Sequence, residues 1–397
     1  MEEQVYRIWT ILSAFEESSA ACISEMLRHV SSGHYMEGVR MAEKFVLHVE
    51  TLFAAIDDLN SAFRSSGSKG MSRSSSLEIR EELICMTSEP EMSHVREARM
   101  LCKKVVNFFM LLSHTHETGA RKMSITQELL SLVTGLAHYL KILIRIALTG
   151  SLKLERDFAN TSAIGIFLGR LDRLARDPDA NRMAQAGSEP SSRSSSREGP
   201  NSRKNSAGHS SSTNGGATNG SRDSGSTIVA SSSKPRPYGY RSLTRAVGTL
   251  VGQGEATTDL CEGCRLTVEE ECARLGTSIR WHLPCLKCNH CGRIASKEQI
   301  PPDSKDEVYV RSFVWAEMDP EGHGGGATFC KECAKRDRGG SLEDTTDGFE
   351  YVTRLEQYAF LLCVALNKLY GRLKQRGVVP ACTSLVLSFI VCFDSFG

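Results

Sequence analysis

The sequence lacks an excess of charge of either sign. It has 48 lysines and arginines against 47 aspartates and glutamates, a formal net charge of +1 over 397 residues. Proteins that bind nucleic acid or other polyanions usually carry a one-signed basic surface. This composition therefore gives no support to a polyanion binder, and we expect no nucleic-acid partner. The length suggests two or three domains.

The sequence also lacks the apolar run of a secretory signal. It begins with the acidic stretch Met1-Glu2-Glu3. Its 14 cysteines are too sparse for the disulfide framework of a small secreted domain. Both features indicate a reducing compartment, and we expect a cytoplasmic protein.

Catalytic motifs are missing as well. The sequence contains no phosphate-binding GxxxxGK[ST], no GxSxG nucleophile turn and no zinc-hydrolase motif. We therefore predict no catalytic residues and no enzymatic activity for this chain.

The middle of the chain has hardly any apolar residues. Residues 179–257 are dominated by Ser, Gly, Asn and Arg, and hardly an aliphatic or aromatic residue occurs between Met183 and Ile228. Such a segment cannot bury enough apolar surface to offset its chain entropy, so we predict a disordered linker. Arg203-Lys204-Asn205-Ser206 resembles a basophilic kinase site, although a plain tether explains it as well.

Residues 1–178, by contrast, repeat apolar residues at helical spacing and predict an all-α bundle of four or five helices. A loop rich in Ser and Gly is predicted at 66–90. Its Arg73-Ser74-Ser75-Ser76 resembles a second kinase site, although the composition favours a plain solvated loop. The predicted helices cover 1–65 with a break at 31–33, 92–118, 124 to about 150, and 163–175. The fourth begins with a capping box at Ser124 and ends near Gly150. His138, Lys141 and Arg145 interrupt its apolar stripe, so we expect a core helix and no membrane partner.

Paired cysteines carry the most specific signal in the chain. Seven cysteines and one histidine follow one another as C-x2-C, H-x2-C, C-x2-C and C-x2-C, which is enough for two tetrahedral zinc sites. The candidate ligands are Cys261, Cys264, His282, Cys285, Cys288, Cys291, Cys330 and Cys333. Four protein ligands leave no open position for water or substrate, so this pattern favours binding over catalysis. Cys272, His290 and His323 lie nearby, and we do not expect them to be ligands.

The C-terminal part predicts one amphipathic helix over 346–376, capped near Asp347 and ended by Gly377. Its apolar positions repeat at a 3–4 spacing from Val352 to Leu373. Two interpretations stay open. The helix either pairs with another helix, from the N-terminal bundle or from a second chain by self-association as a coiled coil, or it is the core helix of a domain that continues further. The apolar tail 377–397 has three possible interpretations. It is a tail anchor, part of an incomplete domain, or a gene-model artefact.

The metal pattern resembles a LIM domain, because Trp281-His282 matches the aromatic–His pair of that family and Leu286 its large apolar residue. The resemblance implies a first zinc on Cys261, Cys264, His282 and Cys285, and a second on Cys288, Cys291, Cys330 and Cys333. The two fingers would pack near Leu286 and would not fold without metal. The stretch from Gly292 to Phe329 is about twice the family's usual length. We predict a strand in it, at 308–310.

A wider resemblance covers about 258–379, and the N-terminal bundle only loosely. The runs from Val268 to Gly276 and from Gln357 to Tyr370 are similar to the last LIM domain of fungal LIM-containing Rho GTPase-activating proteins. This implies a regulatory or targeting module that binds Rho-pathway, cytoskeletal or polarity proteins at the cytoskeleton or at sites of polarised growth. No arginine-finger loop is recognisable, so the catalytic domain of that family is expected elsewhere. A stand-alone LIM adaptor without catalytic activity is the alternative.

Overall fold

The computed structural model describes ten stretches of the chain: residues 2–70, 77–114, 122–176, 239–240, 242–243, 258–276, 278–295, 309–317, 326–337 and 348–377. Most of the predicted linker, the tail after Gly377, His323 and both candidate kinase sites lie outside these residues.

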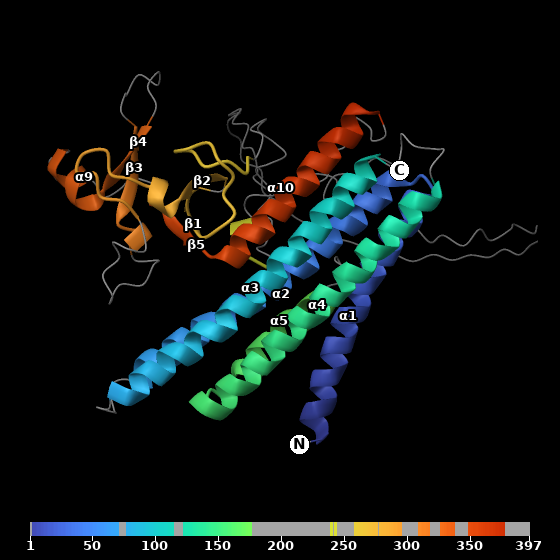
Figure 1. Ribbon diagram of the computed structural model, residues 1–397, viewed down its shortest axis with the longest axis horizontal. Coiled ribbons are helices and arrows are strands. Elements are labelled where there is room, and N and C mark those ends of the chain that lie inside the picture. Colours follow the sequence, from blue (N-terminus) through green and yellow to red (C-terminus); the bar gives the residue numbers. More distant parts are fainter. Residues whose placement is uncertain are drawn as a thin grey trace, which may run out of the picture. The chain divides into compact units, whose positions relative to one another are not determined.

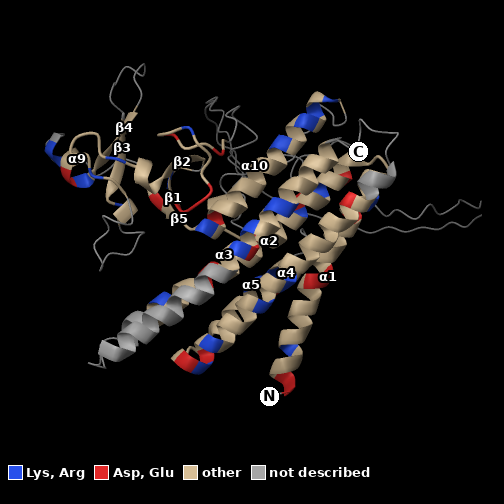
Figure 2. Ribbon diagram, in the orientation of Figure 1, with Lys and Arg blue, Asp and Glu red and all other residues tan. Residues whose placement is uncertain are grey.

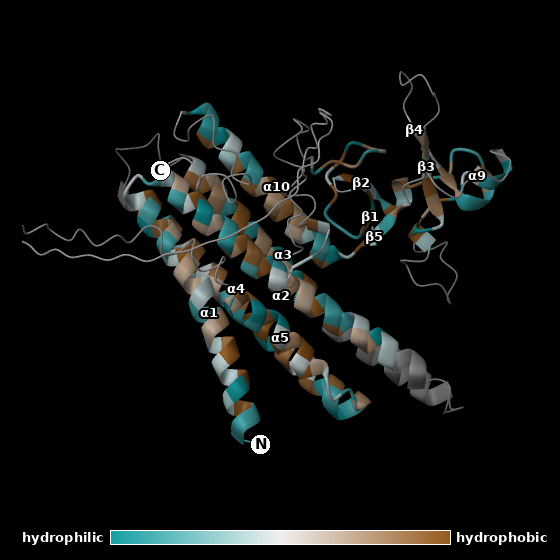
Figure 3. Cartoon of the chain, turned by 180° about the vertical axis from the view of Figure 1, so that it is seen from behind, coloured by the Kyte–Doolittle hydropathy of each residue, from teal (hydrophilic) through white to brown (hydrophobic). Residues whose placement is uncertain are grey.

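Five helices of the N-terminal region form a bundle around one continuous apolar cluster. They are α1 (Glu2–Ser31), α2 (Tyr35–Gly70), α3 (Leu77–His114), α4 (Lys122–Phe158) and α5 (Ala163–Arg176), shown in Figure 1. Hydrophobic and hydrophilic residues alternate along each helix (Figure 3), as expected when one face is buried. The predicted break after α1 is confirmed, since Gly33 takes a φ of +78° there.

Two predicted boundaries in this region were wrong. The loop expected at 66–90 is mostly helical, because α2 continues to Gly70 and α3 begins at Leu77. Glu78, Arg80 and their neighbours favour helix, so the breaking residues extend only as far as 76. The fourth helix does not end near Gly150. It continues to Phe158, whose ring packs at 5.9 Å from that of Phe63, and a glycine inside a helix costs only about 1 kcal/mol.

Within the part of the chain that the structure describes, one helix meets the length and hydropathy expected of a membrane span. It is α4, over Gln127–Phe158. A core helix of a bundle can have the same composition, and Leu136, Leu143 and Leu154 of α4 are fully buried in the bundle cluster. Exposed Lys141 reaches Glu16 of α1 at 3.6 Å.

The C-terminal helix completes this bundle. Helix α10 (Arg354–Gln375) packs along α2 and α3, and its apolar stripe belongs to the same cluster as theirs. Of the two interpretations left open by the sequence, pairing with the N-terminal bundle is therefore correct, and this stripe is already covered within the chain. The end at Gly377 is confirmed by its φ of +69°.

The start of this helix differs from the prediction. Thr353 caps α10 by accepting a hydrogen bond from the backbone N–H of Glu356 at 3.1 Å. The preceding residues form strand β5 (Glu350–Val352) instead of a helical turn. Thr353-x-x-Glu356 has the spacing of a capping box. Asp347, the predicted cap, lies outside the described residues.

Between α5 and α10 lies a small cysteine-rich module with two sheets. Strands β1 (Cys272–Leu275) and β2 (Ile279–His282) form an antiparallel sheet with β5 in the order β2-β1-β5, and β3 (Phe313–Glu317) pairs antiparallel with β4 (Gly326–Cys330). Two short helices complete it, the 3-10 turn η1 (Leu283–Cys285) and α9 (Lys331–Asp337).

The module has its own apolar core around Leu286 and Trp281. The Trp281 ring lies 5.0 Å from that of Phe349 and 5.7 Å from that of Trp315. The strand predicted at 308–310 was wrong. Tyr309 and Val310 form a helical turn, held by the hydrogen bond from the Tyr309 hydroxyl to the Ile294 carbonyl at 2.9 Å, while Val308 lies outside the described residues.

Candidate metal centre

The first four predicted ligands come together from three local structures. Cys261 and Cys264 lie on one tight turn, His282 ends β2, and Cys285 ends η1. Their ligand atoms all lie within 4.8 Å of one another. His282 Nδ1 is 3.3 Å from Cys264 Sγ and 3.8 Å from Cys285 Sγ. We refer to these residues as the first group, and to 258–286 as the first finger.

The orientation of the His282 ring suits metal binding. Nδ1 faces the cysteine sulfurs, and Nε2 lies 3.1 Å from the backbone carbonyl oxygen of Thr267. An Nε2–H that donates to this carbonyl leaves Nδ1 without a proton and able to bind a metal. Metal-binding histidines in proteins are usually fixed by such a second hydrogen bond.

The second four predicted ligands form an equivalent group. Cys288 and Cys291 lie on a second tight turn, Cys330 ends β4 and Cys333 lies in the first turn of α9. Their sulfurs also lie within 4.8 Å of one another, with Cys291 Sγ 3.8 Å from Cys330 Sγ. These residues are the second group, and 287–337 is the second finger. The long stretch between Gly292 and Phe329 does not separate the four sulfurs.

The two cysteine turns share one backbone conformation. In each, the residue after the second cysteine is left-handed, with a φ of +60° at Arg265 and +74° at Gly292. The backbone N–H of that residue donates to the carbonyl of the first cysteine, at 2.8 Å for Arg265 and 3.0 Å for Gly292. Burial alone would raise the pKa of the Cys288 thiol, but N–H groups around the second turn lower it to about 6. The turn thus favours the thiolate, which is the form that binds metal.

The dimensions of both groups fit zinc. A tetrahedral site with Zn–S bonds of about 2.3 Å has sulfur–sulfur edges of about 3.8 Å, and a Zn–N bond of about 2.0 Å gives nitrogen–sulfur edges of about 3.5 Å. The sulfur–sulfur distance of 3.8 Å in the second group and the nitrogen–sulfur distances of 3.3 and 3.8 Å in the first lie near these values. A donor set of thiolates and one imidazole is also typical of structural zinc sites. Each group could therefore hold a metal ion.

Neighbouring donors stay outside both groups. Cys272 is fully buried in β1, and its thiol donates to Gln357 Oε1 at 3.4 Å. His290 is exposed on the second turn and does not belong to either group. The expectation that these two residues are not ligands agrees with their positions.

Sequence reasoning missed the residues that attach the first finger to α10. Gln357 is fully buried, and its Nε2 donates to the Val268 carbonyl at 2.8 Å. The Arg280 guanidinium, also buried, lies 3.2 Å above the centre of the Phe360 ring. A glutamine among apolar residues, as in Gln357-Tyr358-Ala359-Phe360, was the available signal.

Complementary charges surround this attachment. The first finger contributes acidic side chains and the helices contribute basic ones. The pairs are Arg354–Glu271 at 2.8 Å, Arg99–Glu269 at 2.8 Å and Lys368–Asp259 at 3.0 Å. Figure 2 shows the acidic stretch of the finger as a red loop beside α10.

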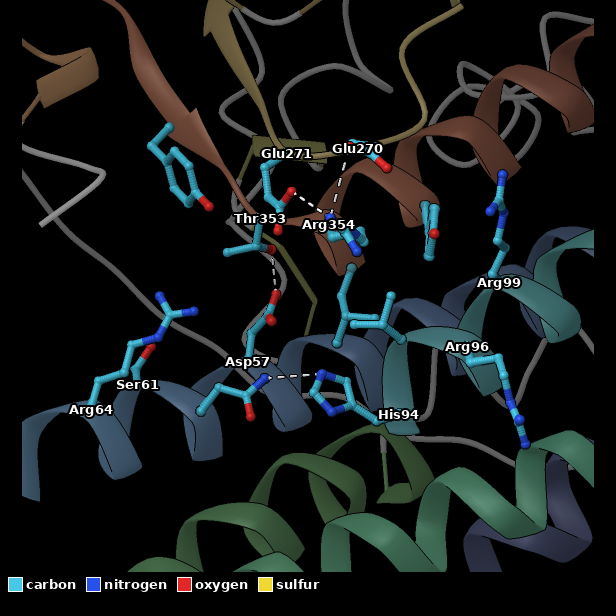
Figure 4. Close-up of a pocket in the computed structure, with 15 residues that line it drawn as sticks. Asp57, Ser61, Arg64, His94, Arg96, Arg99, Glu270, Glu271, Thr353 and Arg354 are labelled. Atoms are coloured by element: carbon cyan, nitrogen blue, oxygen red, sulfur yellow. Dashed lines mark hydrogen bonds and ion pairs between the residues drawn. The ribbon is translucent and has the colours of Figure 1, made fainter. Parts of the chain in front are cut away.

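A cleft of about 760 Å³ opens beside the attachment, between α2, α3 and the start of α10. Figure 4 shows Arg354 in its wall, reaching the carboxylates of Glu270 and Glu271. Deeper in the wall, Asn60 Nδ2 lies 3.3 Å from His94 Nε2. The charged groups of the wall that form these pairs hold the finger and the bundle together.

Comparison with known proteins shows that this chain is similar to part of two fungal Rho GTPase-activating proteins. The chain is 32% identical over 370 residues to Rho-type GTPase-activating protein 1 of Schizosaccharomyces pombe, which covers 93% of the chain. It is 23% identical over 366 residues to Rho-GTPase-activating protein LRG1 of Saccharomyces cerevisiae, covering 91%. The similarity includes the helical bundle, for which the sequence indicated only a loose resemblance.

The chain spans about a quarter of the length of these relatives, 24% and 26% respectively. No family model matches the chain, and no solved structure matches it significantly.

Proposed function

We propose that this chain is a regulatory part of a Rho GTPase-activating protein, in which a LIM-type module with two zinc ions binds other proteins of the Rho pathway. The observation that carries the proposal is the pair of four-ligand groups, each with the spacing and donor set of a structural zinc site. The similarity of more than nine tenths of the chain to Rho GTPase-activating proteins supports the pathway.

The proposed role is recognition. In each group all four metal positions would be taken by protein side chains, and a metal without an open position supplies no activated water and no Lewis acid for a substrate. The zinc ions would instead hold the turns, strands and short helices of the two fingers in place. We expect acceleration of GTP hydrolysis to belong to a part of the relatives outside the quarter that this chain spans. We place the protein in the cytoplasm.

The metal assignment is tested by elemental analysis of the purified full chain. We expect two zinc ions per chain, and about one in each of the variants His282→Ala and Cys333→Ser. Cys272→Ser is the control, because its thiol points at Gln357, and it should keep both ions. One zinc or none in the unaltered chain would overturn the proposal of a double zinc module.

The regulatory role is tested separately by adding the zinc-loaded chain to Rho-family GTPases. We expect an unchanged rate of GTP hydrolysis, measured by phosphate release, together with binding of Rho-pathway proteins that is lost after chelation. An accelerated rate would show that this chain is itself catalytic, and binding that persists without zinc would contradict recognition by the module.

A further inference from the structure

A short segment in the C-terminal half of the predicted linker is packed against the bundle. Tyr240 is partly buried and packs against the bundle's apolar cluster, and Leu243 is 2% exposed and belongs to that cluster. Gly239 lies so close to Glu50 that a side chain there would collide with the carboxylate. We call residues 239–243 the strap. The sequence predicted only disordered linker here, because five residues are too few to show a pattern.

Three hydrogen-bond donors of the strap each donate to a carboxylate oxygen. The Tyr240 backbone N–H donates to Glu50 Oε1 at 2.8 Å, and the Tyr240 hydroxyl donates to Asp57 Oδ2 at 2.6 Å. The Ser242 hydroxyl donates to Glu356 Oε1 at 2.5 Å. Glu50 and Asp57 belong to α2 and Glu356 to the first turn of α10, so the strap joins these two helices.

Because its hydroxyls donate to carboxylates, the docked strap is sensitive to a negative charge added to one of these hydroxyls. A hydroxyl can donate to a buried carboxylate, whereas a phosphate brings a charge of about −1.5 to −2 and only acceptor oxygens. Glu356 lies largely out of water, and burial raises the pKa of its carboxyl, so a second anion beside it would be poorly screened. A phosphate on a strap hydroxyl and the docked strap therefore exclude each other.

Of the two hydroxyls, that of Ser242 has the sequence context of a serine kinase site. Both residues are only partly buried, but arginines stand before and after Ser242 in the sequence, at Arg241 and Arg245. Basic neighbours are what a basophilic serine kinase recognises, and the strap spans only a few residues, so it can open without unfolding a helix of the bundle.

We propose that Ser242 is a phosphorylation site and that a phosphate on it releases the strap from α2 and α10. A protein kinase would transfer the γ-phosphoryl group of ATP to Ser242 Oγ. The bond between the γ-phosphorus and the bridging oxygen breaks, a phosphorus–Oγ bond forms, the hydroxyl proton goes to solvent and ADP leaves. The start of α10 is joined to the first finger through β5, which pairs with β1. On phosphorylation it loses one of its links to α2.

The test treats the full zinc-loaded chain with a basophilic serine kinase and ATP. Mass spectrometry maps the phosphates, and hydrogen–deuterium exchange follows the backbone amides of the strap. We expect phosphate on Ser242 and an increase of about tenfold or more in strap exchange, which corresponds to a loss of about 1.4 kcal/mol of local protection. Helix content measured by circular dichroism should stay unchanged.

Two variants distinguish release of the strap by a phosphate on Ser242 from a general effect of added charge or of substitution. Ser242→Ala loses one hydrogen bond but gains no charge, so its strap should stay protected after kinase treatment. Ser206→Asp adds a negative charge elsewhere in the linker and should leave the exchange of the strap unchanged. The proposal is overturned by a strap that stays protected with phosphate on Ser242, or by a kinase that modifies other linker serines while leaving Ser242 unmodified.

Discussion

At the residue scale, Asp57 is the most strongly perturbed carboxyl described near α10. It is partly buried in the wall of the cleft, and loss of contact with water raises its pKa to about 7, although hydrogen bonds from Thr353 and Tyr240 act in the opposite direction. Thr353 Oγ1 donates to the same Oδ2 atom as Tyr240, at 2.5 Å. The nearby carboxylates Glu356 and Asp58 raise the pKa further. One side chain thus joins the cap of α10, the strap and α2.

This pKa predicts a pH dependence of stability. The folded protein holds the Asp57 proton more tightly than the unfolded chain, so the stabilisation is complete below the ordinary value of 3.8 and is lost as pH rises towards 7. Asp57→Asn keeps an acceptor oxygen but has no proton to lose. Relative to Asp57→Asn, the unaltered chain should therefore lose on the order of 2 kcal/mol of unfolding free energy between pH 5 and 7.5, on the scale of ~1.4 kcal/mol per pKa unit.

The measurement is urea unfolding of both proteins at each pH. The difference in unfolding free energy between the two proteins is taken at the same pH. This difference removes the pH dependence that comes from the metal-binding cysteines and from His48, whose pKa is lowered to about 4 by burial. Parallel curves for the two proteins would show that Asp57 is ionised in the folded state throughout.

At the scale of single elements, α10 makes contacts on two sides, with α2 and α3 and with the first finger. Gln357 lies on the finger side, where it accepts from Cys272 and donates to Val268. Removal of a buried hydrogen-bonding partner leaves the remaining groups unsatisfied, at a cost of about 1–3 kcal/mol.

We therefore expect Gln357→Ala to lower the free energy of unfolding by about 1–3 kcal/mol. Gln375→Ala is the matched control, since Gln375 is the same residue type on the exposed end of the same helix, and its effect should stay within about 0.5 kcal/mol. Chemical unfolding followed by helix signal measures both. Equal effects of the two substitutions would mean that the finger does not stabilise α10.

The elements differ in how far the sequence predicts them. Long apolar stripes predicted α1, α2, α4 and α5 because burial of one helix face repeats over many turns, and the C-x2-C pairs predicted which eight residues gather. Short or single-residue signals were less consistent, since the predicted breaks at Gly33 and Gly377 are confirmed but several others failed. Thr353 caps α10 six residues after the predicted cap at Asp347, Gly150 does not end α4, and the strap at Tyr240 depends on acids almost 200 positions earlier in the chain.

At the scale of the whole described fold, the first finger belongs to the helical bundle as much as to the cysteine-rich module. Its strand β1 pairs with β5, and β5 leads through Thr353 into α10. The second finger contributes β3, β4 and α9, and its backbone meets this route at the bridge between Val314 and Gly348. Loss of metal from the two groups should therefore have unequal consequences for the helices.

We expect His282→Ala to lower the midpoint of helix melting by about 5 °C or more, and Cys333→Ser by less than about 2 °C, where 1 kcal/mol corresponds to about 2–4 °C for a fold of this size. The measurement is thermal unfolding followed by circular dichroism at 222 nm, with the zinc content of each variant determined in parallel. A larger effect of Cys333→Ser would show that the second finger, and not the first, supports the bundle.

The position of α10 after the module in the chain has a consequence for synthesis. Helices α2 and α3 leave the ribosome long before α10, which covers their common apolar side. Until the linker, both fingers and α10 have been made, that side stays exposed to the cell, and exposed apolar surface in an incomplete chain promotes aggregation. The nascent protein thus passes through a long interval in which chaperones, and the supply of zinc to the emerging first finger, decide whether the bundle closes.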